Sequence, residues 1–308
     1  MSANVETMMY VRETPWHGLG TMVQEAPNSA EALKLAGLDW EVKPTDIILG
    51  GDYGNVIEGH KANVRTSDGA VLGIVTDRYK VVQNAEAFSF TDSLIGGDVR
   101  YETAGSLHGG RKVWMLAKLP SETVVGDEVT PYMCFTNSHD GTGAIQVCMT
   151  PIRVVCNNTL NIALNTAKRK WSTKHMGNIE EKMHEAQMCL EYGAEYMASL
   201  AVEAERLANK PITDDRIREI LDELFPVKET DSDRVKNNAK KMKDEFMICY
   251  FMPDIKKFQN TAWGVVNAMS DMVTHTAPIR NTQNYKENNW GRIMVGNALI
   301  DSVVSSVA

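Results

Sequence analysis

The change in hydrophobic pattern near Gly177 restricts the fold of this 308-residue chain more than any other feature. Before it, the apolar runs are short, rich in β-branched residues and separated by turn-forming residues, which is typical of strands. After it, apolar residues recur at helical spacing over 178–209, 214–225, 233–251 and 258–275. We therefore expect an α+β fold, with an antiparallel sheet in an N-terminal domain, residues 1–176, and an all-helical region, residues 177–308.

The first domain is expected to begin with three strands and two helices. The strands are predicted at 39–49, 55–67 and 70–82, where apolar residues partly alternate and glycine-containing turns intervene. One helix follows Asn28 or Ser29 as its N-cap, and a second is capped by Asn84. No regular element is predicted before residue 28.

The central part of the chain is expected to form a β-β-β-α unit. Strands are predicted at 111–120, 131–139 and 143–151, and the HDGTG sequence between the last two is typical of a hairpin loop. A helix is then predicted from Asn157 or Asn158 to Trp171, because apolar residues recur at helical spacing.

A basic segment lies at the end of that predicted helix. No carboxylate occurs between Asp140 and Glu180, although the whole chain has a formal net charge of -8. Residues 105–176 contain eight Lys or Arg and four acidic residues. Cations with an embedded tryptophan suggest nucleic acid, since phosphates bind cations and bases stack on aromatic rings. An ordinary helix C-terminus also favours cations through its dipole, so this alternative stays open.

Composition excludes several classes of protein. The five cysteines are widely spaced and form no CxxC motif, which argues against a disulfide framework or a zinc ribbon and fits a reducing cytoplasm. No apolar run reaches the roughly 18 residues needed to span a bilayer, and the N-terminus lacks the pattern of a secretory signal. We expect a cytoplasmic protein with no membrane partner.

Two enzymatic interpretations remain open beside a binding function. His139 and Asp140 are possible metal ligands, but two adjacent side chains do not make a site, so no metal is predicted. Cys156, with His139 or His175 and a neighbouring asparagine, contains the residue types of a Cys-His-Asn hydrolase. A cysteine at the end of an apolar strand is also an ordinary core residue. We expect no enzymatic activity and no cofactor.

Several segments in combination resemble the phage/plasmid-like proteins of the DUF932 family. They are PWHGLG (15–20), GIVTDRYKVVQNAEAF (73–88), NSHDGTGAIQV (137–147), TPIRVVCNNTL (150–160), TAWGVVNAMSDMVTH (261–275) and NNWGRIMVGNAL (288–299). The resemblance runs from about Thr14 to beyond Trp290. It implies a phage, prophage or plasmid gene acting in a host cell, often beside DNA-metabolism functions, and it supplies no activity.

The β-β-β-α order is also similar to the core of Rad52-like single-strand annealing proteins. That resemblance is one of topology and charge, and it implies a ring or filament that holds single-stranded DNA in a basic groove. A sequence pI of about 5.5 is low for a DNA-binding protein, and an oligomer would compensate because many weak basic patches act together.

The main prediction is an ATP-independent single-stranded DNA-binding and annealing protein that forms homo-oligomers. The alternatives are a counter-defence or partner-binding protein, with the basic pocket holding a small anion, and the hydrolase described above. The residues predicted to bind nucleic acid are Arg111, Lys112, Arg153, Lys168, Arg169, Lys170, Trp171 and Lys174.

Overall fold

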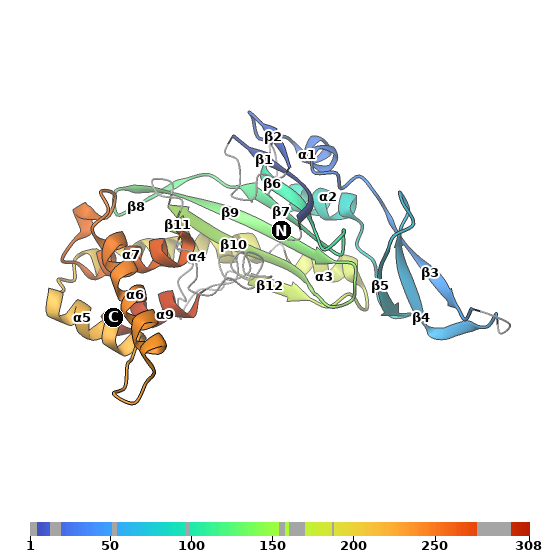
Figure 1. Ribbon diagram of the computed structural model, residues 1–308. Coiled ribbons are helices and arrows are strands. Elements are labelled where there is room, and N and C mark those ends of the chain that lie inside the picture. The colour runs from blue at the N-terminus through green and yellow to red at the C-terminus, as the bar shows by residue number, and fades with distance from the viewer. Residues whose placement is uncertain are drawn as a thin grey trace. The chain divides into compact units, whose positions relative to one another are not determined.

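The computed structural model describes residues 5–12, 20–50, 54–95, 99–153, 158–159, 170–186, 188–275 and 297–308. The chain forms two compact units whose ranges interleave along the sequence. Unit 1 comprises Met1–Leu119, Tyr132–Met149 and Arg169–Gly193, and unit 2 comprises Pro120–Pro131, Thr150–Lys168 and Ala194–Ala308. Most helices lie in the C-terminal part, so the predicted α+β class is confirmed (Figure 1). The predicted domain boundary at 176/177 stays a prediction.

The larger of two sheets contains nine strands among the described residues. Its order is β11-β10-β9-β7-β6-β1-β2, with β12 paired to β10 and β8 paired to β9. β1 and β2 pair in parallel, whereas the pairs β1–β6, β6–β7, β7–β9, β8–β9, β10–β11 and β10–β12 are antiparallel. The strands are β1 (Val5–Val11), β2 (Thr21–Val23), β6 (Arg100–Leu107), β7 (Lys112–Lys118), β8 (Glu122–Val124), β9 (Asp127–Ser138), β10 (Ile145–Arg153), β11 (Asn158–Thr159) and β12 (Lys170–Thr173).

The second sheet is an antiparallel meander in unit 1. It consists of β3 (Val42–Ile48), β4 (Val56–Arg65) and β5 (Val71–Thr76), in that order. These strands confirm the three that the sequence predicts at 39–49, 55–67 and 70–82. The Asp68-Gly69 turn between β4 and β5 is tight, and Gly69 has a φ of +73°, a value that glycine adopts without strain.

Two helices cover part of the larger sheet within unit 1. Helix α1 (Ser29–Leu35) begins with a capping box in which Asn28 accepts from the Glu31 N–H and the Glu31 side chain accepts from the Asn28 N–H. Helix α2 (Asn84–Ile95) packs on α1 and on β7, while α1 packs on β6 (Figure 1). Both helices agree with the sequence prediction.

The prediction was wrong at the N-terminus and after the third central strand. Strands β1 and β6 pair with each other at positions where no strand was predicted. The predicted β-β-β part is present as β7, β9 and β10, but the helix predicted from Asn157 or Asn158 to Trp171 is contradicted at both described ends. Asn158–Thr159 and Lys170–Thr173 are strands, because both pair with β10; the rest of that segment lies outside the described residues.

The C-terminal part of the chain is helical where it is described. Its helices are α3 (Ile179–Glu185), α4 (Met188–Ala208), α5 (Asp214–Leu224), α6 (Asp233–Tyr250), α7 (Ala262–His275) and α9 (Ala298–Val307). The long helix predicted at 178–209 is divided between α3 and α4. Within unit 2, α7 packs against α6 and α9, and α5 packs against α9. No helix among the described residues is long and apolar enough to cross a membrane.

Candidate functional site

Five of the eight residues predicted to bind nucleic acid have described side chains. Lys170, Arg111 and Lys174 are exposed, and Lys112 and Trp171 are half-buried. Arg153 is the last residue of β10, and only its backbone is described. Lys168 and Arg169 lie outside the described residues, as does Cys156 of the hydrolase interpretation.

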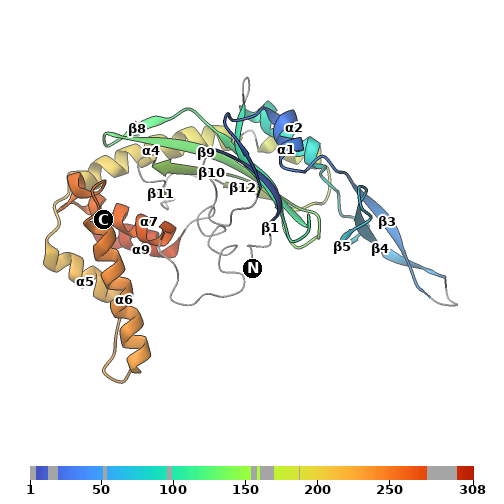
Figure 2. The ribbon, with the colours of Figure 1, turned by 45° about the horizontal axis from the view of Figure 1, so that its top comes forward.

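The basic cluster lies on strand β12 and not at the end of a helix. β12 pairs with the first half of β10, where Lys170 is opposite Cys148 and Thr173 is opposite Ile145 (Figure 2). Successive side chains of a strand point to opposite faces. The exposed Lys170 and Ser172 therefore share one face, and Trp171 points to the other. The stacking of a base on Trp171 stays a prediction, and this alternation places it on the face of β12 opposite to Lys170.

Three other predicted cations, Arg111, Lys112 and Lys174, lie near the tip of the β9–β10 hairpin, at one end of the sheet. Lys112, at the start of β7, pairs with Ser138 beside the tip of the β9–β10 hairpin. Lys174 follows Thr173, which pairs with Ile145 on the other side of the same tip. The Arg111 carbonyl accepts from the His139 N–H at 2.7 Å. The fold thus brings the Arg111-Lys112 turn and the end of β12 to the same hairpin. We call Arg111, Lys112, Lys170 and Lys174 the basic surface.

A buried polar cluster lies beneath this hairpin. We call it the histidine cluster and define it as Asn63, Tyr79, Asn84, His139 and His175. His139 Nε2 is 3.1 Å from Asn84 Oδ1, and His175 Nδ1 is 2.9 Å from the Lys80 carbonyl. Asn63 Nδ2 donates to the His139 carbonyl at 2.8 Å. Tyr79 stacks on His175 with ring centroids 4.5 Å apart, and its hydroxyl donates to the Ser138 carbonyl.

Burial controls the ionisation of the two histidines. Desolvation, together with the nearby His175, lowers the pKa of His139 to about 3 against a smaller opposing effect of Asp140. Desolvation also lowers the pKa of His175, although its bond to the Lys80 carbonyl opposes this. Both imidazoles are therefore neutral near pH 7.

Asp140 holds the hairpin turn together. Its carboxylate accepts from the Ser138 hydroxyl and from both the backbone N–H and the hydroxyl of Thr142. Burial opposes the ionisation of Asp140, but these bonds outweigh burial and lower its pKa. The turn also packs closely on β5, since a Cβ added to Gly73 would lie 2.5 Å from the Asp140 Cα. Among the described residues, no group of three or more His, Cys, Asp or Glu side chains is placed to hold a metal ion.

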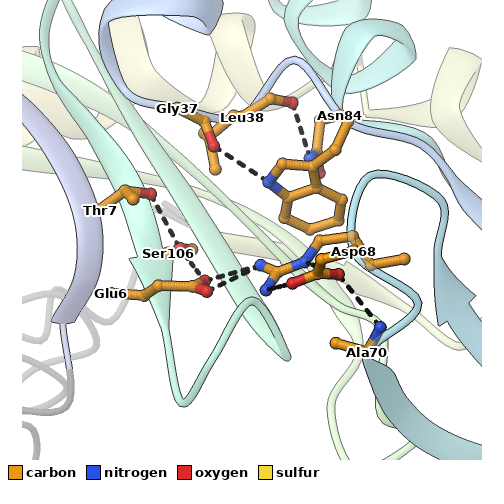
Figure 3. A network of polar contacts seen from close by, with 10 residues as sticks. Glu6, Thr7, Gly37, Leu38, Asp68, Ala70, Asn84 and Ser106 are labelled. Atoms are coloured by element: carbon orange, nitrogen blue, oxygen red, sulfur yellow. Dashed lines mark hydrogen bonds and ion pairs between the residues drawn. The ribbon is translucent and has the colours of Figure 1, made fainter.

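An ion-pair network fixes the second sheet beside the histidine cluster. Arg65, on β4, donates to both Glu6 carboxylate oxygens at 2.8 and 3.0 Å and to both Asp68 oxygens at 2.6 and 3.0 Å (Figure 3). Its guanidinium lies 5.3 Å from the centroid of the Trp40 ring, whose edge contact with His139 has a centroid distance of 5.4 Å. Ser106 also donates to Glu6, so the network joins β1, β4 and β6.

A cavity of about 940 Å³ in unit 1 is lined in part by Lys80. Its lining residues come from two segments, Lys80 to Ser93 and Gly177 to His184. The charged or titratable ones are Lys80, Glu86 and His184. A lining with one lysine and one carboxylate does not favour a small anion. The alternative function, a counter-defence or partner-binding protein that holds a small anion, stays a prediction, and this cavity does not support it.

Sequence reasoning missed Asn63 and Arg65, and it named Asn84 only as a helix cap. One signal in the sequence pointed to the histidine cluster: segments 73–88 and 137–147 are both among the segments that resemble DUF932 proteins. The structure places them in contact, with Tyr79 and Asn84 from the first segment bonded to Ser138 and His139 from the second.

A family model described as a domain of unknown function, DUF932, matches residues 71–292, which is more than half of the chain. The chain belongs to the DUF932 family. The DUF932 match includes most of the histidine cluster and the whole basic surface, and Asn63 and Arg65 precede it. No curated protein and no solved structure matches this chain.

Proposed function

We propose that this DUF932 protein binds single-stranded DNA on its basic surface and promotes annealing of complementary strands without ATP. The observation that supports the proposal is the position of Lys170 and Lys174 along an extended segment. At ~3.3 Å per residue, their Cα atoms lie roughly 13 Å apart. Cations spaced in this way suit separate phosphates along an extended polyanion better than one compact anion.

Three of the four cations of the basic surface are available to a ligand. Lys170, Lys174 and Arg111 are exposed, and none of them forms an ion pair with another described residue. By contrast, Arg65 and Lys257 are bound by carboxylates in the structure. A cation without an intramolecular partner gains more from a phosphate, since no existing pair has to be broken.

Because the rest of the chain is acidic, we expect DNA to contact each copy only at its basic surface, and we expect several copies to bind one strand together. A single basic surface on a chain of net charge -8 gives weak binding, and a ring or filament of copies along one strand multiplies it. Arg153, Lys168 and Arg169 stay predicted DNA contacts on sequence grounds alone. Trp171 is not used, because it points away from Lys170.

The proposal predicts the effect of removing three cations. In the triple variant Arg111→Ala/Lys170→Ala/Lys174→Ala, the slope of log K against log salt for a single-stranded oligonucleotide should become shallower by about 2, since each lost phosphate contact on single strands removes about 0.7. Affinity at low salt should fall by at least about tenfold. Fluorescence anisotropy over a salt series measures both quantities.

The matched control removes the same charges from another surface. Arg234, Lys240 and Lys241 are exposed residues of α6, so Arg234→Ala/Lys240→Ala/Lys241→Ala has the same net charge as the first variant. The control should retain the wild-type slope. Equal effects of the two triple variants would show that only overall charge matters and would refute the basic surface as the contact.

A further inference from the structure

Three buried polar atoms of the histidine cluster have no hydrogen-bond partner among the described residues. They are Asn63 Oδ1, His139 Nδ1 and His175 Nε2. Their residues are 0%, 0% and 3% exposed. An unpaired buried polar atom costs roughly 1–3 kcal/mol, so three in one cluster call for a physical reason.

The hydrogen bonds of the cluster determine which of these atoms are acceptors. Asn84 Nδ2 donates to the Leu38 carbonyl at 3.0 Å, which identifies Asn84 Oδ1 as an acceptor. His139 Nε2, 3.1 Å from that oxygen, must therefore be the donor. In a neutral imidazole, the proton on Nε2 leaves His139 Nδ1 with a lone pair and no hydrogen, so Nδ1 can only accept.

The same reasoning applies to the other two atoms. The Lys80 carbonyl only accepts, so His175 Nδ1 carries the proton and His175 Nε2 has the lone pair. Asn63 Nδ2 donates to the His139 carbonyl, which makes Asn63 Oδ1 an acceptor. The cluster thus contains three buried acceptors and no donor to satisfy them.

Contacts within the cluster keep the three residues together. Asn63 is bonded to the His139 backbone, and Tyr79 links the His175 ring to the Ser138 carbonyl, next to His139. Each imidazole also donates its other N–H to an oxygen, as metal-binding histidines almost always do. Neutral imidazole is the commonest ligand of Zn²⁺ and similar ions, and an amide oxygen can complete the set.

We propose that His139 Nδ1, His175 Nε2 and Asn63 Oδ1 bind a first-row divalent transition-metal ion such as Zn²⁺. Two histidines and one amide form a donor set different from the clusters of His, Cys, Asp and Glu considered above. The ion joins β4, the β9–β10 hairpin and the segment after β12, so it stabilises the end of the sheet that presents the basic surface. A buried water has only two hydrogens and leaves one of the three acceptors unpaired.

The test is a zinc titration of the full-length protein after removal of metals with a chelator. Isothermal titration calorimetry and elemental analysis should find about one Zn²⁺ per chain. His139→Gln and His175→Gln should each weaken binding at least about 100-fold. His60→Gln and His184→Gln, which change exposed histidines, should bind as the wild type does.

A measurement on the wild type keeps the test independent of variant folding. X-ray absorption of the zinc-loaded protein should show two imidazole nitrogens with oxygen ligands and no sulfur. Absence of stoichiometric binding would indicate a buried water and overturn the proposal. Sulfur ligands, or unchanged binding in folded His139→Gln and His175→Gln proteins, would overturn it as well.

Discussion

Replacing Arg65 with leucine is expected to lower the free energy of unfolding by about 3 kcal/mol, near the lower end of the range for breaking a buried ion pair. The substitution leaves the Glu6 carboxylate, whose side chain is 26% exposed, without its cation, and it removes the guanidinium from the Trp40 ring. Arg65 also joins β1 to β4, so its loss weakens the attachment of the second sheet. Urea denaturation followed by circular dichroism measures the change.

The matched control is Arg218→Leu. Arg218 pairs with Asp215 on α5, but these side chains are 71% and 86% exposed. Exposed pairs contribute at most about 1 kcal/mol, so this variant should lose far less stability. Arg65→Lys should rescue only part of the loss, because an ammonium cannot reproduce the forked contacts to two carboxylates. Equal destabilisation by Arg65→Leu and Arg218→Leu would contradict this account of the network.

Acid is expected to destabilise the chelator-treated protein through His139. The pKa of this residue is about 3 in the folded chain and near 6.5 in the unfolded chain. Below pH 6.5 the unfolded chain binds a proton on this histidine that the folded chain does not. The contribution of neutral His139 to the free energy of unfolding is therefore fully present above pH 6.5 and is lost as the pH falls toward 3. The shift corresponds to a loss of up to about 5 kcal/mol. His175 acts in the same direction.

Comparison with His139→Gln separates this effect from that of the carboxylates. The free energy of unfolding, measured in urea between pH 7 and pH 4, should fall less steeply for His139→Gln than for the wild type. His184→Gln changes an exposed histidine and should keep the wild-type slope. If His139→Gln and wild type lost stability in parallel, His139 would not be a buried neutral base.

Local patterns in the sequence predict α1, α2, most of the C-terminal helices and six of the twelve strands among the described residues. The cap at Asn28, the hairpin glycines and the alternating apolar residues of β7 and β10 act within a few residues, so they can be recognised without tertiary information. β1 and β6 are strands because they pair with each other, although about 95 residues separate them in the sequence, as in the pairing of Tyr10 with Thr103. Such a distant partner cannot be recognised from local patterns. The apolar spacing after Asn158 indicated a helix, and pairing with β10 overrides it at both described ends.

The candidate site was predictable only in part. The cations of the basic surface stood out because they interrupt an acidic chain, and the fold brings Arg111, Lys112 and Lys174 to one hairpin. The histidine cluster combines residues from β4, the segment before α2, the β9–β10 hairpin and the end of β12. Its members are unremarkable as single residues, since burial and hydrogen bonds give Asn63 and His175 their character only after folding.

The most direct test of the central claim is the binding of the wild-type protein to labelled single-stranded DNA of increasing length at low and high salt, with light scattering to give the mass of the complex. The account predicts salt-sensitive affinity that rises with oligonucleotide length, together with an oligomer of many copies. A monomer or dimer that binds no oligonucleotide at low salt would contradict it.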